Sequence, residues 1–238
     1  MKSLQNNIFF LIKLLYPDKC PVCDKALPRI NDGFCPGCKK NMQFLLPPLC
    51  EKCGRPAKVG EKICSECSES KHFFDGGRCV FPYSYIQSSI YRFKYMKRPD
   101  YAKAFGKAVT EHAGEWLERL EPDALIPVPL YKKRLIQRGY NQAEELAKAI
   151  SEETGIPCKA SVAARIKNTV MQKYFDKKHR QINLKKAFLV RESVVKLDTV
   201  VIVDDIFTTG STIDSLALEL KDAGVKNVFF LALAAAGT

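Results

Sequence analysis

The chain has 238 residues, of which 46% are hydrophobic and 27% are charged. This ordinary globular composition excludes a disordered or fibrous protein, and the length suffices for one large domain or a large and a small one. Lysine and arginine number 38 against 26 aspartates and glutamates, so the net charge of +12 favours anionic partners. The apolar stretch Ile8–Leu15 is too short to span a membrane, and Tyr16-Pro17 follows it where a signal peptide has small residues. We therefore expect a cytoplasmic protein without a membrane span.

Eight of the ten cysteines form four Cys-x-x-Cys pairs within the first 67 residues. Such a turn offers two thiolates to one metal ion, and Zn²⁺ prefers four thiolates in a tetrahedron. Two pairs joined by a loop of about a dozen residues close one site, so four pairs predict two structural zinc ions. The predicted ligands are Cys20, Cys23, Cys35, Cys38, Cys50, Cys53, Cys64 and Cys67.

Two features of these sites stay open in the sequence. The pairs combine either sequentially, first with second and third with fourth, or in a cross-braced arrangement, first with third and second with fourth. Redox chemistry or an iron–sulfur cluster is the competing interpretation, although four regular pairs fit two closed zinc tetrahedra better. Cys79 and Cys158 lack such partners and are expected to be small packed residues. We expect a zinc-binding domain over residues 1–80 and a second domain, with most of the positive charge, over residues 81–238.

From residue 81 onward, helical and strand patterns alternate. Apolar residues recur at helical spacing from Ile86 to Leu120, over Asn141–Ser151 and over Ser211–Ala223. Three short apolar runs are typical of buried parallel strands, namely Ala124–Val128, Val200–Val203 and Val228–Leu233. This alternation predicts an α/β domain with a parallel sheet.

The most informative segment is Val200-Val-Ile-Val-Asp-Asp-Ile-Phe-Thr-Thr-Gly-Ser-Thr212, in which a strand leads through two acidic residues into a turn and a helix. The carboxyl end of a parallel strand is where α/β proteins bind ligands, and the N–H groups that begin a helix suit a phosphate. The predicted phosphate-binding residues are Thr208, Thr209, Gly210, Ser211 and Thr212. Asp204 and Asp205 would repel a phosphate, so we expect them to accept hydrogen bonds from the vicinal hydroxyls of a sugar.

This segment resembles the phosphoribosyl pyrophosphate (PRPP) motif of type I phosphoribosyltransferases. The order of the further motifs is similar to the ComF family of late-competence, phosphoribosyltransferase-like proteins. These motifs are the cysteine pairs, Arg138-Gly-Tyr-Asn-Gln142, Gln172, Arg180, Asn183, Ala187-Phe188 and finally the PRPP motif. The resemblance implies a type I phosphoribosyltransferase fold, with its parallel sheet, preceded by a small Cys-rich zinc-binding domain.

The resemblance also implies roles for individual residues. Asp204 and Asp205 would hold the ribose 2′- and 3′-hydroxyls, and the following loop would hold the 5′-phosphate. Mg²⁺ would accompany PRPP and neutralise its pyrophosphate. In the superfamily the loop after the first strand takes the pyrophosphate, which implies this role for Lys133 and Arg134 and brings Arg138 within reach of the leaving group. Any retained chemistry would be displacement at the ribose anomeric carbon, with the acidic pair acting by position and charge.

Residues 165–191 contain nine basic side chains against one acidic one, with aromatic residues interleaved, and Tyr91–Arg98 is a second such run. Single-strand binding requires cations for the phosphates and rings for the bases, although a solvated helix face has the same composition. The net charge, the zinc-binding domain and the family's association with DNA uptake favour single-stranded DNA. The predicted contacts are Lys173, Tyr174, Lys177, Lys178, Arg180, Lys185 and Lys186.

We therefore expect a ComF-like protein that binds PRPP and handles single-stranded DNA during DNA uptake, with DNA-uptake or recombination proteins as further partners. The alternative is an active phosphoribosyltransferase that acts on a small nitrogenous acceptor. A PRPP-sensing regulator ranks third, because the sequence shows no helix-turn-helix. Pyrophosphate release on addition of an acceptor would favour the enzyme, whereas salt-sensitive binding of single strands without turnover would favour the DNA-handling protein.

Overall fold

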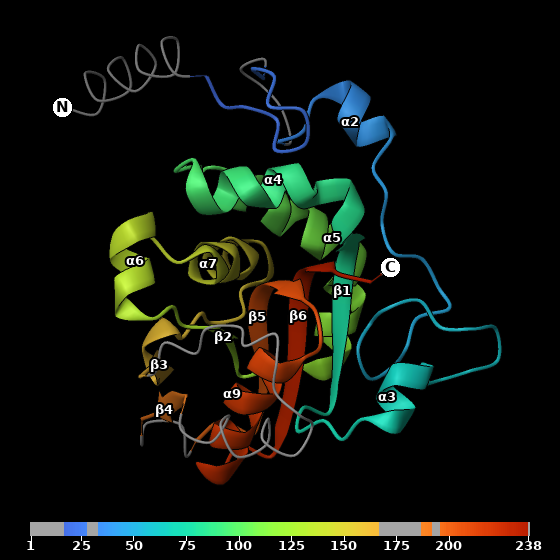
Figure 1. The fold of residues 1–238 in the computed structure, drawn as a ribbon, viewed down its shortest axis with the longest axis vertical. Helices are drawn as coiled ribbons and strands as arrows, with labels where there is room; N and C mark the ends of the chain where they lie inside the picture. The colour runs from blue at the N-terminus through green and yellow to red at the C-terminus, as the bar shows by residue number, and fades with distance from the viewer. Residues whose placement is uncertain (1–16, 28–32, 167–186, 192–195, 238) are drawn as a thin grey trace, which may run out of the picture.

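A computed structural model describes residues 17–27, 33–166, 187–191 and 196–237 (Figure 1). Its centre is a parallel four-stranded sheet in the order β1-β6-β5-β2. The strands are β1 (Gly76–Pro82), β2 (Ala124–Pro127), β5 (Thr199–Phe207) and β6 (Asn227–Ala235). The predicted parallel α/β arrangement is therefore confirmed.

Helices cover both faces of this sheet (Figure 1). Helices α4 (Tyr83–Tyr95), α5 (Tyr101–Leu120) and α7 (Gln142–Thr154) pack on one face, and α9 (Ser211–Asp222) packs on the other. Strand β5 divides the two cores, because alternate side chains of a strand point to opposite faces. Val201 and Val203 lie in the core beneath α4, α5 and α7, whereas Val200 and Ile202 lie in the core beneath α9.

The remaining described elements are short. They are α2 (Pro36–Lys40), α3 (Ser65–Glu69), α6 (Lys132–Arg138), the 3₁₀ helix η1 (Ala160–Val162), β3 (Ala163–Arg165) and β4 (Phe188–Val190). Strands β3 and β4 pair antiparallel beside the main sheet. No pattern in the sequence predicts this pair, because three residues are too few to show the alternation of a strand.

Strand β1 pairs with β6 from Gly76 onward. The sheet therefore includes residues 76–80, which the sequence analysis assigned to the zinc-binding domain. Gly77 faces the ring of Phe230 so closely that a Cβ on Gly77 would come within 2.1 Å of the ring. Glycines are uncommon inside strands except where another group approaches closely, and they conceal this strand in the sequence.

Helix α7 shows how local sequence signals set the ends of an element. The Asn141 side chain accepts a hydrogen bond from the N–H of Ala143 at 3.2 Å, as an N-cap residue does. Gly155 ends the helix with a φ of 77°, which glycine adopts without strain. The predicted helix over Asn141–Ser151 is therefore confirmed, with Asn141 as its cap and its last turn extended to Thr154.

Both edge strands of the main sheet are covered by other parts of the chain. At β1, the N–H of Leu45 donates to the carbonyl oxygen of Val80 at 2.9 Å. Gly54 lies so close to the β1 backbone that a Cβ on Gly54 would approach a backbone atom to 2.6 Å. At β2, Leu125 forms an isolated bridge with Cys158. Within the described part of the chain, no helix is long and apolar enough to cross a membrane.

Candidate functional site

The eight paired cysteines form two groups of four within the described residues. Cysteine site 1 consists of Cys20, Cys23, Cys35 and Cys38, and cysteine site 2 consists of Cys50, Cys53, Cys64 and Cys67. In each group the sulfur atoms all lie within 4.8 Å of one another. The pairing is therefore sequential, and the cross-braced alternative is wrong.

The geometry of both groups fits zinc. The sulfur atoms of Cys23 and Cys35 are 3.7 Å apart, and so are those of Cys53 and Cys64. A tetrahedron with Zn–S bonds of about 2.3 Å has an edge of about 3.8 Å. The N–H of Cys64 also points at the Cys50 sulfur at 3.3 Å, as expected beside a metal-bound thiolate. Four thiolates leave no position for a substrate, so both sites suit a structural ion.

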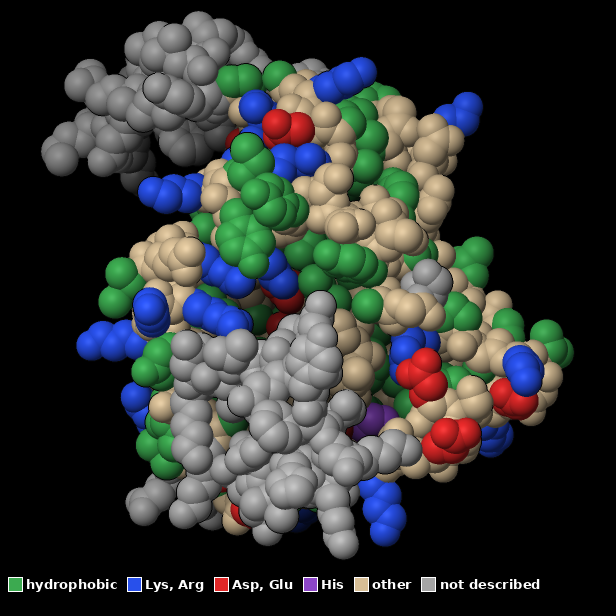
Figure 2. Space-filling model, viewed as in Figure 1, with side chains coloured by type: hydrophobic (Ala, Val, Ile, Leu, Met, Phe, Trp, Pro, Cys, Tyr) green, Lys and Arg blue, Asp and Glu red, His purple; other side chains and the backbone are tan. Residues whose placement is uncertain are grey.

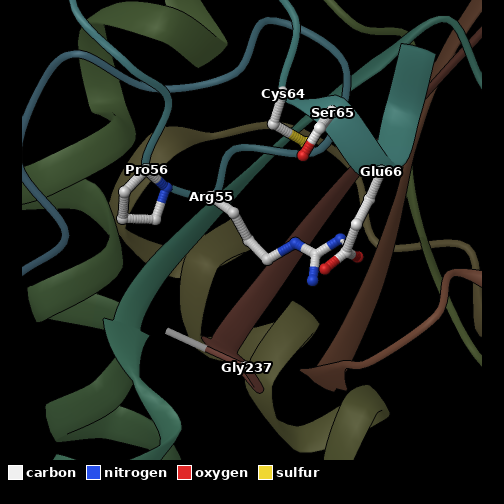
Figure 3. Close-up of a pocket in the computed structure, with 6 residues that line it drawn as sticks. All are labelled: Arg55, Pro56, Cys64, Ser65, Glu66 and Gly237. Atoms are coloured by element: carbon white, nitrogen blue, oxygen red, sulfur yellow. Dashed lines mark hydrogen bonds and ion pairs between the residues drawn. The ribbon is translucent and has the colours of Figure 1, made fainter. Parts of the chain in front are cut away.

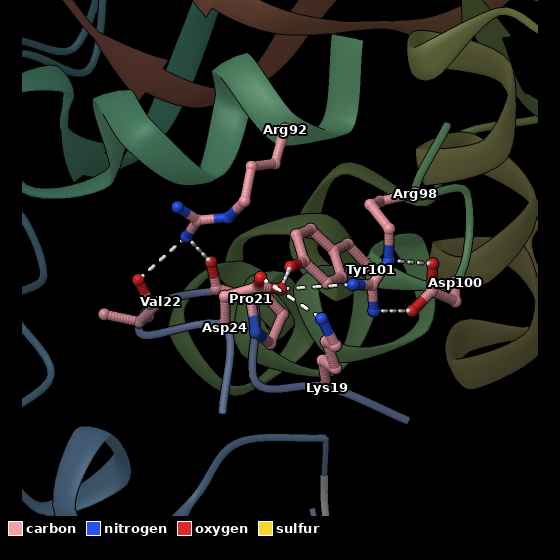
Figure 4. A network of polar contacts seen from close by, with 8 residues as sticks. All are labelled: Lys19, Pro21, Val22, Asp24, Arg92, Arg98, Asp100 and Tyr101. Atoms are coloured by element: carbon pink, nitrogen blue, oxygen red, sulfur yellow. Dashed lines mark hydrogen bonds and ion pairs between the residues drawn. The ribbon is translucent and has the colours of Figure 1, made fainter. Parts of the chain in front are cut away.

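Cysteine site 1 is tied to helices α4 and α5 by a polar network (Figure 4). The Asp24 carboxylate accepts hydrogen bonds from Tyr101 Oη at 2.5 Å and from Arg98 Nη1 at 3.1 Å. Arg92 donates to the carbonyl oxygens of Pro21 and Val22 at 2.8 and 2.9 Å. Because Pro21 and Val22 lie inside the first Cys-x-x-Cys turn, α4 holds this metal-binding turn directly.

Cysteine site 2 contributes to the core on the other face of the sheet, the face that α9 covers. Cys50, Cys53 and Cys67 belong to the same buried cluster as Phe207 at the end of β5. Arg55 is 8% exposed, forms an ion pair with Glu66, and places its guanidinium 5.5 Å from the centre of the Phe207 ring. Arg55 and Glu66 contact each other and line a cavity of about 290 Å³ together with Pro56, Cys64, Ser65 and Gly237 (Figure 3).

The acidic pair Asp204-Asp205 lies within β5, close to its carboxyl end. The carboxylate of Asp205 forms an ion pair with Lys94 Nζ of α4 at 2.8 Å, and the two side chains are only 11% and 17% exposed. Asp204 accepts a hydrogen bond from the N–H of Asp205 at 2.8 Å. On this face of the molecule, Lys and Arg side chains gather around a recessed acidic patch (Figure 2).

Burial raises the pKa of Asp204 well above its usual range, and the neighbouring carboxylate of Asp205 adds to this rise. Lys94 opposes the rise through its positive charge. Two adjacent carboxylates with one ammonium leave one negative charge without a close partner, so protonation of Asp204 relieves the repulsion. Hydrogen-bond donors from a ligand, such as sugar hydroxyls, would relieve it without a proton.

The loop after β5 has the features expected of a phosphate site. Gly210 has a φ of 77° and immediately precedes α9, which begins at Ser211. Thr208, Thr209 and Ser211 are exposed, so their hydroxyls are available to a ligand. The loop lines a small hollow of about 20 Å³ together with Asp204 and Thr212. The structure thus brings all the residues predicted for PRPP in this loop to the N-terminus of a twelve-residue helix.

His72 supports this loop from behind. Its Nδ1 lies 2.9 Å from Asp214 Oδ2 in the first turn of α9, and both side chains are nearly buried, at 7% and 13% exposed. The N–H of Phe73 donates to the other oxygen of Asp214 at 2.8 Å. A Cβ on Gly210 would lie 3.3 Å from the His72 ring, so this ring touches the loop itself.

Arg165 is a further cation within electrostatic range of the acidic pair. Burial lowers the pKa of Arg165 in β3, and the positive charge of Arg134 lowers it further, while the charge of Asp204 raises it. Arg134 in α6 and Asp204 therefore both lie within electrostatic range of Arg165. Lys133 is exposed on the same helix.

Arg138 at the end of α6 is directed to other partners. Its guanidinium donates to Gln142 Oε1 at 2.7 Å and lies 5.0 Å from the centre of the Tyr95 ring. Arg138 therefore packs against Tyr95 at the end of α4. The residue of α4 that contacts the acidic pair is Lys94.

The predicted DNA contacts fall outside the described residues. This holds for Lys173, Tyr174, Lys177, Lys178, Arg180, Lys185 and Lys186. The second basic and aromatic run, Tyr91–Arg98, lies within the described residues, and its aromatic side chains differ in burial. Phe93 is fully buried, whereas Tyr91 and Tyr95 are 58% and 55% exposed and their ring centres lie 5.2 Å apart.

The comparison with known proteins covers nearly the whole chain. Competence protein F of Haemophilus influenzae is 32% identical over 228 residues, which are 92% of this chain and 97% of that protein. The chain belongs to the competence protein F family. A further relative, the DNA utilization protein YhgH of Salmonella typhimurium, is 27% identical over 219 residues, or 90% of this chain and 96% of that protein.

Two other comparisons match only part of this chain. Residues 11–68 match the double zinc ribbon domain, which agrees with the two cysteine sites and confirms the zinc-binding region. A solved structure described as glutamine PRPP amidotransferase from B. subtilis is similar over 60% of this chain and 30% of that chain, with 20% identity and a TM-score of 0.41.

Sequence reasoning missed four residues that lie near the acidic pair or behind the loop over residues 208–212. They are Lys94, Arg165, His72 and Asp214. Lys94 and Arg165 belong to basic runs, and such a run does not show in sequence which of its members lies near an acidic pair. His72 has no partner nearby in the chain, because Asp214 lies 142 residues away.

Proposed function

We propose that this protein binds PRPP with Mg²⁺ around Asp204, Asp205 and the loop over 208–212. The observation that carries the proposal is the junction of β5 and α9. There, the carboxylate of Asp204, a left-handed glycine and a helix N-terminus meet in one recess, and Asp205 is the next residue along β5. The carboxylates suit the two ribose hydroxyls, and the loop N–H and hydroxyl groups suit the 5′-phosphate.

The cations around the recess support a pyrophosphate group next to the ribose. Lys94 of α4 contacts Asp205, Arg165 of β3 lies within electrostatic range of Asp204, and Arg134 of α6 lies within electrostatic range of Arg165. Lys133 and Arg138 extend the positive charge along α6, and Arg138 packs against Tyr95 of α4. Mg²⁺ prefers carboxylate and phosphate oxygens, and when bound with PRPP it would neutralise the pyrophosphate charge. Asp204 and Asp205 would hold the ribose, and no proton transfer is required of them.

The test of PRPP binding is calorimetry on the parent and on the double variant Asp204→Asn, Asp205→Asn. The amides keep the shape of the side chains but are poorer acceptors for the ribose hydroxyls, so we expect the variant to lose binding. The Asp123→Asn variant is a matched control, because Asp123 is an aspartate outside this recess that accepts hydrogen bonds from the N–H groups of Asp198 and Thr199. Equal affinity in the parent and the double variant would overturn the proposal.

We also propose that the protein handles single-stranded DNA during DNA uptake in the cytoplasm, in company with DNA-uptake or recombination proteins. The names of its relatives, competence protein F and DNA utilization protein, support a role in DNA use. The net charge of +12 and the basic stretch over 165–191 support contact with phosphates. The exposed ring pair Tyr91 and Tyr95, with Arg138 beside Tyr95, offers a further surface on which a base can stack.

An active phosphoribosyltransferase is the second candidate function. The cations around the recess favour it, because they suit a pyrophosphate leaving group better than ribose binding alone requires. In this reaction the bond from the anomeric carbon to pyrophosphate breaks, and a bond to an acceptor nitrogen forms. Release of pyrophosphate when candidate acceptors are added to protein, PRPP and Mg²⁺ would establish it.

A further inference from the structure

The segment between cysteine site 2 and β1 passes directly behind the PRPP loop. Only four residues separate Cys67, the last ligand of the site, from His72. The His72 ring stacks on Phe74 with 4.6 Å between the ring centres, and Phe74 is fully buried. The ring is therefore held in place by the core. Its position also depends on cysteine site 2, because the short segment after Cys67 leads directly to His72.

His72 and the adjacent backbone hold both oxygens of one carboxylate. The Asp214 side chain receives His72 Nδ1 at 2.9 Å and the Phe73 N–H at 2.8 Å. Because an ionised carboxylate only accepts hydrogen bonds, His72 donates from Nδ1. Asp214 lies in the first turn of α9, and its own N–H donates to the carbonyl oxygen of Gly210 at 2.8 Å. Holding Asp214 therefore also holds the turn that presents the loop N–H groups.

A second contact reaches the loop from the same cysteine site. Arg55, two residues after Cys53, lies over the ring of Phe207. That ring lies beneath Gly210, where a Cβ would approach it to 3.1 Å. Gly210 thus packs against both Phe207 and His72. Phe207 is covered by Arg55, which follows Cys53, and His72 follows Cys67, so both contacts are linked to cysteine site 2.

From these contacts we infer that His72 is a positioning residue for the PRPP loop and that cysteine site 2, through its bound metal, keeps this residue in place. The role of the loop in binding PRPP rests on the proposed function. The contacts among His72, Asp214 and Gly210 do not depend on it. An anion site made of backbone N–H groups works only if the groups point at one place, so a loosened first turn of α9 weakens phosphate binding.

The test compares three variants of the zinc-loaded full-length protein. His72→Leu removes the donor at similar size, whereas His72→Asn keeps a side-chain N–H near the position of Nδ1. Tyr101→Phe removes a hydrogen bond to Asp24 near cysteine site 1 and serves as the matched control. Hydrogen exchange at the amides of residues 208–214 is measured without ligand, and PRPP affinity is measured with Mg²⁺.

We expect His72→Leu to speed the exchange of these amides and to weaken PRPP binding about tenfold, the effect of losing one hydrogen bond to a buried charge. His72→Asn should restore most of both properties, and Tyr101→Phe should change neither. Parent-like exchange and affinity in His72→Leu would overturn the inference. If the parent itself does not bind PRPP, the proposed function fails, and the exchange data still decide the role of His72.

The metal dependence is tested with one cysteine variant in each site. Cys64→Ser removes a partly buried ligand from cysteine site 2, and Cys35→Ser removes one from cysteine site 1. We expect faster exchange over residues 208–214 in Cys64→Ser and parent-like exchange there in Cys35→Ser. Equal exchange over residues 208–214 in both variants would show that cysteine site 2 does not stabilise the loop more than cysteine site 1 does. Should His72→Leu fail to fold, Asp214→Asn replaces it, because it weakens the same contact at unchanged size.

Discussion

Lys94 of α4 and Asp205 of β5 form an ion pair of 2.8 Å in which both side chains are largely shielded from water. The pair joins a helix from one face of the sheet to the strand end where the loop begins. It also means that the acidic pair is not free in the absence of ligand, since one of its two carboxylates already has a cation. A ribose that binds here must share Asp205 with Lys94.

Breaking this pair from one side should destabilise the fold. Lys94→Met leaves a shielded carboxylate without its donor, and we expect the free energy of unfolding to fall by about 1–3 kcal/mol. Asp205→Asn should cost less, because the amide still accepts a hydrogen bond from Lys94. Chemical denaturation of both single variants and the double variant gives the coupling energy. Additive effects would mean that the pair contributes nothing to stability.

Asp204 should make the ligand-free protein less stable as pH rises. Its pKa is raised in the folded state, so the folded protein holds a proton that the unfolded chain releases above about pH 4. Stability is therefore lost as the pH climbs from that value through the raised pKa. Asp204→Asn removes the buried charge, and we expect it to stabilise the protein by about 1–2 kcal/mol at pH 8 and little at pH 4. Denaturation curves at both pH values check this, and a gain that does not change with pH would contradict it.

Metal analysis should find two zinc ions per chain. Each cysteine site completes one tetrahedron, so Cys35→Ser and Cys64→Ser should each lower the zinc content to about one. Chelation should unfold the region over residues 17–67 and leave the central sheet, because most residues of its two cores lie outside this region. Iron in place of zinc, or no metal in freshly reduced protein, would contradict the prediction.

Single-stranded DNA binding should depend on salt and on the basic stretch over 165–191. We expect the logarithm of the affinity to fall with the logarithm of salt concentration, with a slope of about −0.7 for each phosphate contacted. Changing Lys177, Lys178, Lys185 and Lys186 to Glu should weaken binding to all sequences alike, because phosphate contacts carry no sequence information. Fluorescence anisotropy with labelled single strands of two different sequences measures both effects.

The control for this experiment reverses four exposed lysines elsewhere. They are Lys103, Lys159, Lys196 and Lys226. The same loss of affinity in both variants would show a general charge effect and no specific surface. Parent-like binding in the first variant would direct the search to Tyr91 and Tyr95 on α4.

The parts of the structure that follow from contiguous sequence were predictable. The apolar run before Asp204, the hydroxyl-rich turn with Gly210 and the spacing of the cysteine pairs each encode their structure within a few residues. The sequential pairing of the cysteines was not decided by spacing, because both arrangements use similar loops. The contact of Lys94 with Asp205 and that of His72 with Asp214 join positions more than a hundred residues apart. Such contacts depend on how the helices pack on the sheet, and no local pattern reports them.

The covered edges of the sheet have a consequence for handling the protein. An unpaired edge strand exposes N–H and C=O groups that pair readily with another chain. Strand β1 is protected by Leu45 and by Gly54, and Gly54 directly follows Cys53, a ligand of cysteine site 2. Loss of metal from this site therefore removes part of the cover from an apolar strand. Metal-depleted protein should then associate edge to edge and precipitate, so that zinc in the growth medium and buffers governs how much protein stays in solution.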